Sequence, residues 1–231
     1  VAEDSANYSF NRSHSIAYST LSAWTIYLKF KYPQRFFVSL LRMTNHEPNP
    51  QEEINKICKE LPHFGIKLLP PDLAISKMDF SFEGSDIRFG LNSIKGVSKK
   101  SLQSILDFRE SEMPTKYDIF LSAKQAKINI GVLSALIQAG ALSDEKYSRA
   151  RLVLEAQSFN LLTDREKRNF LALGKKYNYD ILSAISDVRK NNMKGDDNRI
   201  LIPDKRFATF KKKYDPYKAI YEQNKQFITV A

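Results

Sequence analysis

The sequence predicts a mainly α-helical fold with a small β-hairpin. Two observations support this prediction. Apolar residues recur at intervals of three and four, as Leu21, Trp24 and Leu28 do, which is the spacing of one helix face. Two extended runs, 79–83 and 86–91, are separated by a two-residue turn, which is the pattern of a hairpin.

Three helices are predicted in the N-terminal part, and their apolar faces are expected to form a core. The first spans about 15–31, and Pro33 suits the first turn of the second. The third begins near Pro50 with Asn49 as its expected N-cap, and 66–69 follows as a short strand. The expected core side chains are Ala17, Leu21, Trp24, Leu28, Phe36, Phe37, Leu40, Leu41, Ile54, Ile57, Cys58 and Leu61.

Two tight glycine turns are each expected to precede an amphipathic helix. Gly96 lies in 94–98, before a helix that contains Leu102 and Ile105, and Gly140 lies in 139–143. Glycine lets the backbone turn sharply and approach a partner closely. The repeated pattern predicts ligand contact through backbone N–H groups, and two ordinary helix turns are the alternative.

The C-terminal part, from 159 onward, is predicted to be helical and basic. Thr163 and Glu166 have the spacing of a capping box, 178–192 is a further helix and 191–198 a polar linker. Basic and aromatic residues then alternate, as in surfaces that follow a nucleic-acid backbone and stack bases, although a solvated helix face is the alternative. They are Lys205, Arg206, Phe207, Phe210, Lys211, Lys212, Lys213, Tyr214, Tyr217 and Lys218.

The charge of the chain favours an acidic partner. The 231 residues carry a formal net charge of +10, for which nucleic acid is the usual partner. No apolar run reaches membrane-spanning length and no signal peptide is recognised, so a cytoplasmic protein without a membrane partner is expected. Cys58 is the single cysteine, which excludes an internal disulfide framework.

The segment 8–19 places basic, hydroxyl and aromatic side chains at the start of the first predicted helix. The N–H groups of a first helical turn have no internal partners and attract anions. Ser13 or Ser15 would cap this helix while Arg12 and His14 face a phosphate. A capped and hydrated helix start is the alternative.

An ordered set of motifs, which spans 7 to about 157, resembles the bacterial C-family replicative DNA polymerases, the DNA polymerase III alpha subunits. Those motifs lie at 8–18, Tyr32-Pro33, 69–72, 87–91, 94–97 and 136–142. The resemblance implies a helical fingers domain with a small β-hairpin at 1–92 and a tandem helix-hairpin-helix domain at 93–158. A basic helical segment of unknown role would follow at 159–231.

The resemblance also implies the site residues. Arg12, Ser13 and His14 would contact the triphosphate of an incoming nucleotide, with Asn11 fixing the loop and Tyr18 near the nucleotide. The hairpins would hold duplex phosphates without reading bases. Their residues are Lys95, Gly96, Val97, Ser98, Lys99 and Lys100 in the first, and Ala139, Gly140 and Ala141 in the second. Ser98 stands where the family hairpin usually has glycine, so it is expected either to cap the helix or to weaken the grip.

The carboxylates that nucleotidyl transfer requires are not recognised. No Asp-x-Asp has a strand setting, and Asp196-Asp197 lies in a polar loop. His14, His46, Cys58 and His63 lack metal-ligand spacing, and there is no P-loop. The family places its catalytic aspartates in an upstream palm domain. We therefore expect the chain to start after the palm, to contain no catalytic residue and to bind no cofactor, with Mg²⁺ bound in the missing palm.

The sequence thus predicts part of a replicative polymerase that binds primer-template DNA and a deoxynucleoside triphosphate, and that is inactive without its palm. A free-standing, non-enzymatic and non-sequence-specific DNA-binding protein is the alternative, and a basic nuclease is a less supported third. The family has a sliding-clamp-binding region beyond the hairpin module. Residues 157–162 fit a clamp peptide poorly, so clamp binding is left open.

Overall fold

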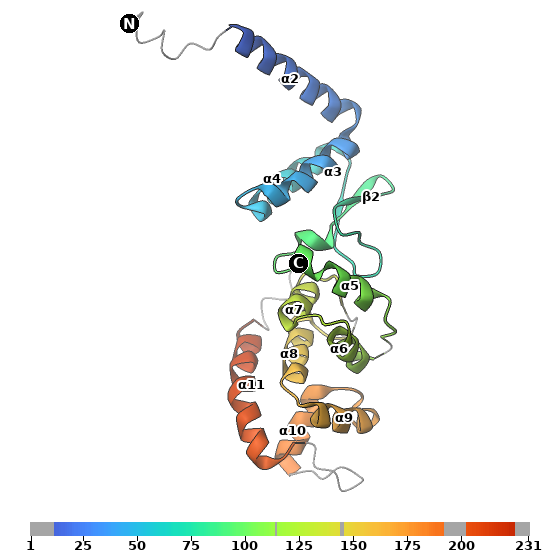
Figure 1. Cartoon of the computed structure of the whole chain (residues 1–231), viewed down its shortest axis with the longest axis vertical. Coiled ribbons are helices and arrows are strands. Elements are labelled where there is room, and N and C mark those ends of the chain that lie inside the picture. The colour runs from blue at the N-terminus through green and yellow to red at the C-terminus, as the bar shows by residue number, and fades with distance from the viewer. Residues whose placement is uncertain (1–11, 114, 144–145, 192–201, 225–231) are drawn as a thin grey trace, which may run out of the picture. The chain divides into compact units, whose positions relative to one another are not determined.

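The computed structural model describes residues 12–113, 115–143, 146–191 and 202–224 (Figure 1). The chain forms two compact units: Val1–Leu69 with Asp79–Phe89, and Pro70–Met78 with Gly90–Ala231. Residues 70–78 thus group with the second unit, whereas the sequence analysis assigned them to the first predicted domain, 1–92. The three-part domain division stays a prediction. The mainly helical fold with a small sheet is confirmed.

The first unit contains the helices α2 (Arg12–Lys31), α3 (Pro33–Met43) and α4 (Pro50–Glu60), and one small sheet. The sheet order is β1-β3-β2. The strands are β1 (Leu68–Leu69), β2 (Ser81–Glu83) and β3 (Asp86–Arg88). Strand β3 pairs in parallel with β1 and antiparallel with β2. The predicted hairpin across Gly84-Ser85 is therefore confirmed, with shorter strands than expected.

The core of the first unit lies between α3, α4 and the sheet. Phe37 and Leu41 of α3 and Ile54 of α4 are buried with Phe80 and Ile87. Polar contacts fix the hairpin to α3: the Gln34 amide donates to the carbonyls of Gly84 and Asp86, and Arg42 Nε donates to the Phe80 carbonyl at 2.9 Å. Pro33 begins α3 as predicted.

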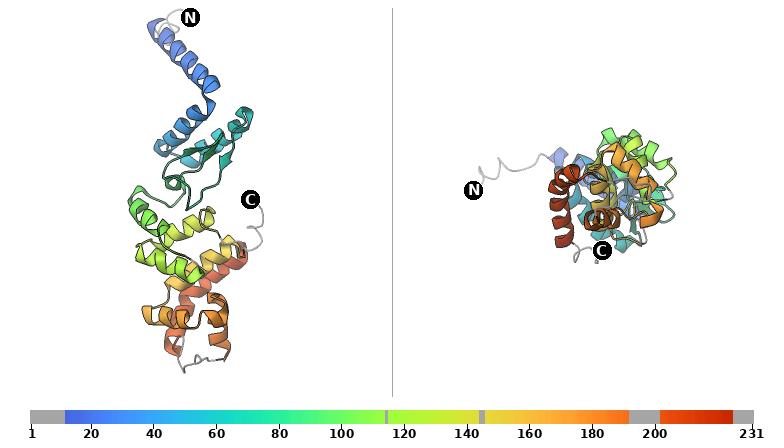
Figure 2. Two further views of the ribbon diagram at one scale, coloured as in Figure 1. Left: turned by 90° about the vertical axis from the view of Figure 1, so that its right-hand side faces the viewer. Right: turned by 90° about the horizontal axis from the view of Figure 1, so that it is seen from below.

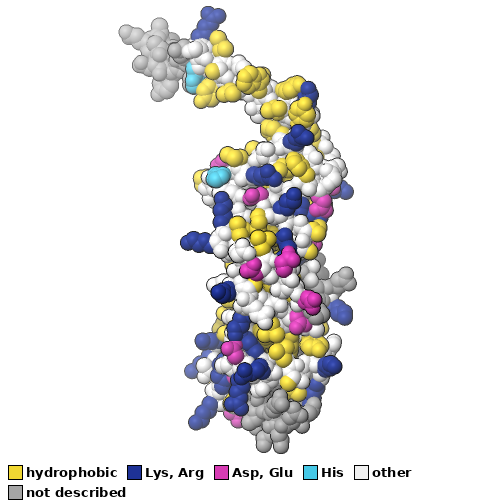
Figure 3. All heavy atoms as spheres, turned by 45° about the vertical axis from the view of Figure 1, so that its right-hand side comes forward, with side chains coloured by type: hydrophobic (Ala, Val, Ile, Leu, Met, Phe, Trp, Pro, Cys, Tyr) yellow, Lys and Arg dark blue, Asp and Glu magenta, His cyan; other side chains and the backbone are white. Residues whose placement is uncertain are grey.

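Helix α2 does not contribute to that core, so its predicted burial is wrong. None of its residues is buried, and Trp24 is 63% exposed. Only its C-terminal end packs on the unit: Lys29 pairs with Glu60, and Phe30 contacts the Phe64 ring. Periodicity predicts an apolar face but does not identify what covers it. Figure 3 shows the resulting apolar side chains along α2.

Three finer expectations about the first unit also change. Asn49 occupies the N-cap position of α4, but its side chain makes no capping bond and donates to Glu52 Oε2 at 3.5 Å. Cys58 is half-buried, and burial raises the pKa of its thiol. Leu40, which was expected in the core, is exposed.

The second unit is a group of helices packed around α8 (Arg149–Asn160). Helices α6, α7, α10 and α11 all contact α8, and the further views in Figure 2 show this arrangement. The helices besides α8 are α5 (Leu102–Arg109), α6 (Lys116–Gln125), α7 (Ile130–Gln138), α9 (Asp164–Ala172), α10 (Ile181–Asn191) and α11 (Asp204–Asn224). No helix among the described residues is long and apolar enough to span a membrane.

The predicted capping box at the start of α9 is confirmed. Thr163 Oγ1 accepts from the Glu166 N–H, and Glu166 Oε2 accepts from the Thr163 N–H at 2.8 Å. Residues 157–160 belong to α8, where Phe159 is buried, so they do not form an extended clamp peptide. Asp196-Asp197 lies outside the described residues.

Base stacking by the aromatic residues of α11 is contradicted in part. Phe207 and Phe210 are buried, because they form the face by which α11 packs on the unit. Lys211, Lys212 and Lys213 are exposed. This part of α11 therefore combines a core-packing face with a solvated basic face.

A polar network crosses the interior of the second unit. Lys116 Nζ lies 2.8 Å from Glu155 Oε2, and Arg151 Nε donates to Glu155 Oε1 at 3.1 Å. Arg151 also pairs with Asp180, immediately before α10, and the Lys116 ammonium lies 3.5 Å from the centre of the Tyr147 ring. The network joins α6, α8 and the start of α10.

Candidate nucleic-acid interface

The first predicted hairpin, 94–98, is anchored by apolar side chains and exposes its charges. Ile94 and Val97 are buried, and the Val97 N–H donates to the Ile94 carbonyl at 3.0 Å. Gly96 between them has a φ of +95°, which an L side chain rarely adopts. Ser98 precedes the 3-10 turn η4 (Lys99–Ser101) but makes no side-chain cap, so the capping expected of it is not observed.

Three lysines surround this hairpin. Lys95, Lys99 and Lys100 are exposed, and none forms an ion pair with a carboxylate among the described residues. The hairpin therefore presents backbone and unpaired cations on the side away from its buried residues. Such a surface suits a phosphate backbone.

The second predicted hairpin, 139–141, is not followed directly by a helix. Gly140 has a φ of +81°, its N–H donates to the Ile137 carbonyl, and the Ala141 N–H donates to the Leu136 carbonyl. This is a Schellman cap that ends α7. Helix α8 begins only at Arg149, so the expected repeat of a turn leading straight into a helix is wrong here. A glycine is the local sequence signal both for the end of a helix and for a hairpin turn, so the sequence did not distinguish the two.

Sequence reasoning missed an arginine at this turn. Arg149 lies so close to Gly140 that a Cβ there would be 2.7 Å from Arg149 Nη2. Arg149 Nη1 donates to the Gln138 carbonyl at 3.4 Å, and the side chain is exposed. The contact joins the start of α8 to the end of α7, and no local sequence pattern indicates it.

The structure also contains a tight connection between α6 and α7 that the sequence did not predict. Lys127 adopts the left-handed region, with a φ of +58°. The Ile128 N–H donates to the Ala123 carbonyl, and Asn129 Oδ1 accepts from the Gly131 N–H at 2.7 Å as the N-cap of α7. No glycine marks this turn, which is why it was missed. Asn129 before an apolar helix was the available signal.

The 94–98 hairpin, the turn at 139–141 and the connection at 126–129 all lie beside helix α7. A Cβ at Gly96 would lie 3.4 Å from Ala135 Cβ, so the first hairpin packs on α7. The turn at 139–141 follows the C-terminal end of α7, and the connection at 126–129 precedes its N-terminal end. The structure therefore brings both predicted hairpins onto one helix of the second unit.

The residues of the opening motif lie on α2 in the first unit. Arg12, Ser13 and His14 occupy its first turn, where there is no acidic residue. The His14 and Tyr18 rings lie one turn apart in a tilted contact, with centroids 4.3 Å apart, and all four residues are exposed. Asn11 lies outside the described residues. The positive end of the helix dipole and the Arg12 guanidinium together favour an anion here.

Comparison with known proteins finds one family model and several DNA polymerase III alpha subunits that are similar to this chain. Residues 65–152 match the family model described as a helix-hairpin-helix motif. The DNA polymerase III subunit alpha of Aquifex aeolicus is 40% identical over 154 residues, which is 65% of this chain and 13% of the relative. The Thermus aquaticus subunit is 38% identical over 155 residues, 66% of this chain and 12% of the relative. The Buchnera aphidicola subunit is 32% identical over 201 residues, 84% of this chain and 17% of the relative.

Proposed function

We propose that this chain, which contains the helix-hairpin-helix region of a bacterial C-family DNA polymerase alpha subunit, holds primer-template duplex for that polymerase. We further propose that the start of α2 binds the triphosphate of the incoming nucleotide. The chain spans about 13% of the length of the Aquifex relative, so the activity and partners of the whole polymerase come to it as proposals.

The duplex-binding proposal rests on the arrangement of buried and exposed residues in the 94–98 hairpin. Its buried Ile94 and Val97 hold the backbone in place, and its three exposed lysines have no carboxylate partner in the described part of the chain. Lysines and backbone N–H groups bind phosphates of any sequence. Arg149 adds a further exposed cation on the same unit.

We expect the chain to bind duplex DNA weakly, without sequence preference and with steep salt dependence. Changing Lys99 and Lys100 to glutamine should lower the log-log salt slope by about 2, since each phosphate contact contributes roughly 0.9. The measurement is fluorescence anisotropy of a labelled duplex across a salt series.

The matched control removes two charges elsewhere on the same unit. Lys212→Gln with Lys213→Gln, on the solvated face of α11, should change the slope by less than the hairpin pair. Equal losses from both pairs would show that only net charge matters. A flat plot for the wild-type chain would rule out phosphate binding altogether.

A second expected result concerns catalysis. We propose that these 231 residues alone do not extend a primer. In the part of the chain that the structure describes, no group of three His, Cys, Asp or Glu side chains could hold a metal ion. A primer-extension assay should give no product with the chain alone, and product when a palm segment with paired carboxylates is joined to it. Extension by the chain alone that Asp196→Asn and Asp197→Asn abolish would contradict this proposal.

A further inference from the structure

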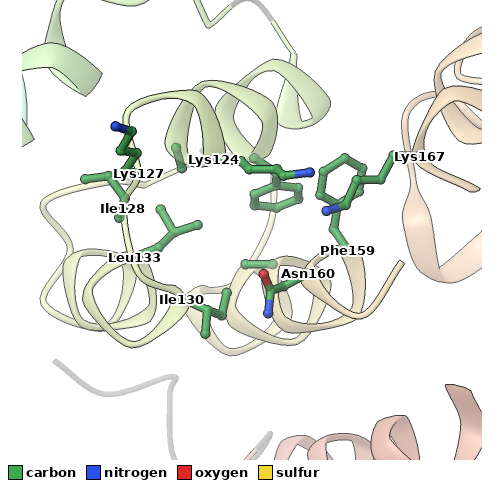
Figure 4. Close-up of a pocket in the computed structure, with 11 residues that line it drawn as sticks. Lys124, Lys127, Ile128, Ile130, Leu133, Phe159, Asn160 and Lys167 are labelled. Carbon is green, nitrogen blue, oxygen red and sulfur yellow. The ribbon is translucent and has the colours of Figure 1, made fainter. Parts of the chain in front are cut away.

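A small pocket opens beside the connection between α6 and α7 (Figure 4). Its cavity measures about 150 Å³, and its apolar lining includes Ile128, Ile130, Leu133, Phe120 and Phe159. An apolar cavity of about this volume holds a benzene-sized group. The pocket therefore has room for one apolar side chain and is too small for a nucleotide with its sugar.

Three lysines line the same pocket. Figure 4 shows the ammonium groups of Lys124 and Lys167 converging beside Phe159, while Lys127 stands at the opposite rim. Lys124 is already paired with Asp164, and both of these side chains are exposed. The cations that remain for a ligand are Lys127, at the surface, and Lys167, which is deeper.

Lys167 is the most buried of the three lysines. It is only 7% exposed, and its ammonium lies 5.3 Å from the centre of the Phe159 ring. The Lys167 ammonium forms no ion pair with a carboxylate among the described residues, because Asp164 on the same helix pairs with Lys124 instead. Burial, and after it the charge of Lys124, lowers the pKa of Lys167. The charge of Asp164 opposes this shift only in part. A buried cation without a directly paired counter-charge is costly, and a bound anion would lower that cost.

We propose that this pocket binds an acidic peptide segment of a protein partner, which inserts one apolar side chain between Ile128, Ile130 and Leu133 and places carboxylates on Lys167 and Lys127. The charges are complementary, and the cavity matches one side chain. Single-stranded nucleic acid fits less well, because it needs exposed rings for stacking and Phe120 and Phe159 are 4% and 2% exposed.

The test uses a defined probe, a fluorescein-labelled peptide in which one phenylalanine is flanked on both sides by aspartates. Its anisotropy should rise saturably with the full chain. Replacing the aspartates by asparagine, or the phenylalanine by glycine, should weaken binding about 10-fold or more. Lys167→Met, which keeps an apolar stem in the buried site, should weaken binding by at least about 10-fold, as loss of a charge-assisted bond does.

A second variant protects the test against misfolding. Lys127 has a φ of +58°, so Lys127→Gly removes the rim charge and also relieves a strained backbone. It should fold at least as well as the wild type and bind the peptide more weakly. Lys212→Gln removes an equal charge on α11 and should leave peptide binding unchanged.

The outcomes separate this proposal from duplex binding. The paired Lys99→Gln and Lys100→Gln changes should weaken duplex binding and leave the peptide unaffected. Peptide binding that is absent, or that is insensitive to both Lys167→Met and Lys127→Gly, overturns the proposal. It is also overturned if Lys167→Met weakens binding of a single-stranded oligonucleotide while the peptide does not bind.

Discussion

Replacing Glu155 with alanine should lower the free energy of unfolding by about 3 to 5 kcal/mol. Glu155 is fully buried, and its partner Lys116 has a side chain that is only 5% exposed. Without Glu155 the Lys116 ammonium stays inside the unit with no counter-charge, and Arg151 loses one of its two carboxylates. Urea unfolding followed by circular dichroism measures the change. Tryptophan fluorescence would not report on this unit, because Trp24 lies in the other one.

Two controls identify the cause of that loss. Replacing the pair together, as Lys116→Met with Glu155→Leu, should recover much of the stability, because no unpaired charge is left. Lys124→Ala breaks an ion pair whose side chains are 53% and 75% exposed, and should cost less than about 1 kcal/mol. If the double variant were no more stable than Glu155→Ala, lost packing would explain the effect rather than an uncompensated charge.

The same carboxylate gives this network a pH dependence with a definite sign. Burial raises the pKa of Glu155, and Lys116 and Arg151 oppose this rise only in part. The folded chain therefore holds the carboxyl proton more tightly than the unfolded chain does. The contribution of Glu155 to stability is complete below the unfolded pKa, near 4.5, and falls as the pH rises through the raised folded value. Glu155→Gln removes the titrating carboxyl group, so this fall in stability with rising pH should be absent from that variant.

Local signals in the sequence predicted the features that depend on a few neighbouring residues. Pro33 starts α3, Thr163 and Glu166 cap α9, and Gly84-Ser85 joins β2 to β3, as expected. Each is decided by backbone geometry or by one side chain that reaches a nearby N–H group. Such features need no knowledge of the tertiary structure.

Features that depend on distant partners were not predictable in this way. The apolar stripe of α2 has the spacing of a core helix, yet nothing in the described part of its unit covers it. Phe207 and Phe210 have the spacing of stacking residues, yet they pack inside. Lys127 turns the chain without glycine, and Arg149 reaches Gly140 only after folding. In each case the partner, and not the local pattern, determines the role.

In a full-length polymerase that carries this segment, Arg12→Ala should raise the nucleotide concentration needed for primer extension roughly 10- to 100-fold. Arg12 lies in the first turn of α2, where Ser13 and His14 accompany it and no acidic residue competes for its charge. Loss of a hydrogen bond from a charged group costs about 1.5 to 3 kcal/mol, which corresponds to that factor. Steady-state extension rates over a nucleotide titration measure it.

The matched control for Arg12 is Arg35→Ala, which removes the same charge from an exposed position on α3 of the same unit. It should leave the nucleotide requirement within about 2-fold, because a single surface charge at a distance is screened by salt. Duplex affinity should stay unchanged in both variants, since the hairpin lysines belong to the other unit. If Arg12→Ala instead weakened duplex binding and left the nucleotide requirement alone, the start of α2 would be a DNA contact. The alternative of a non-enzymatic DNA-binding protein would then explain this motif better than nucleotide binding does.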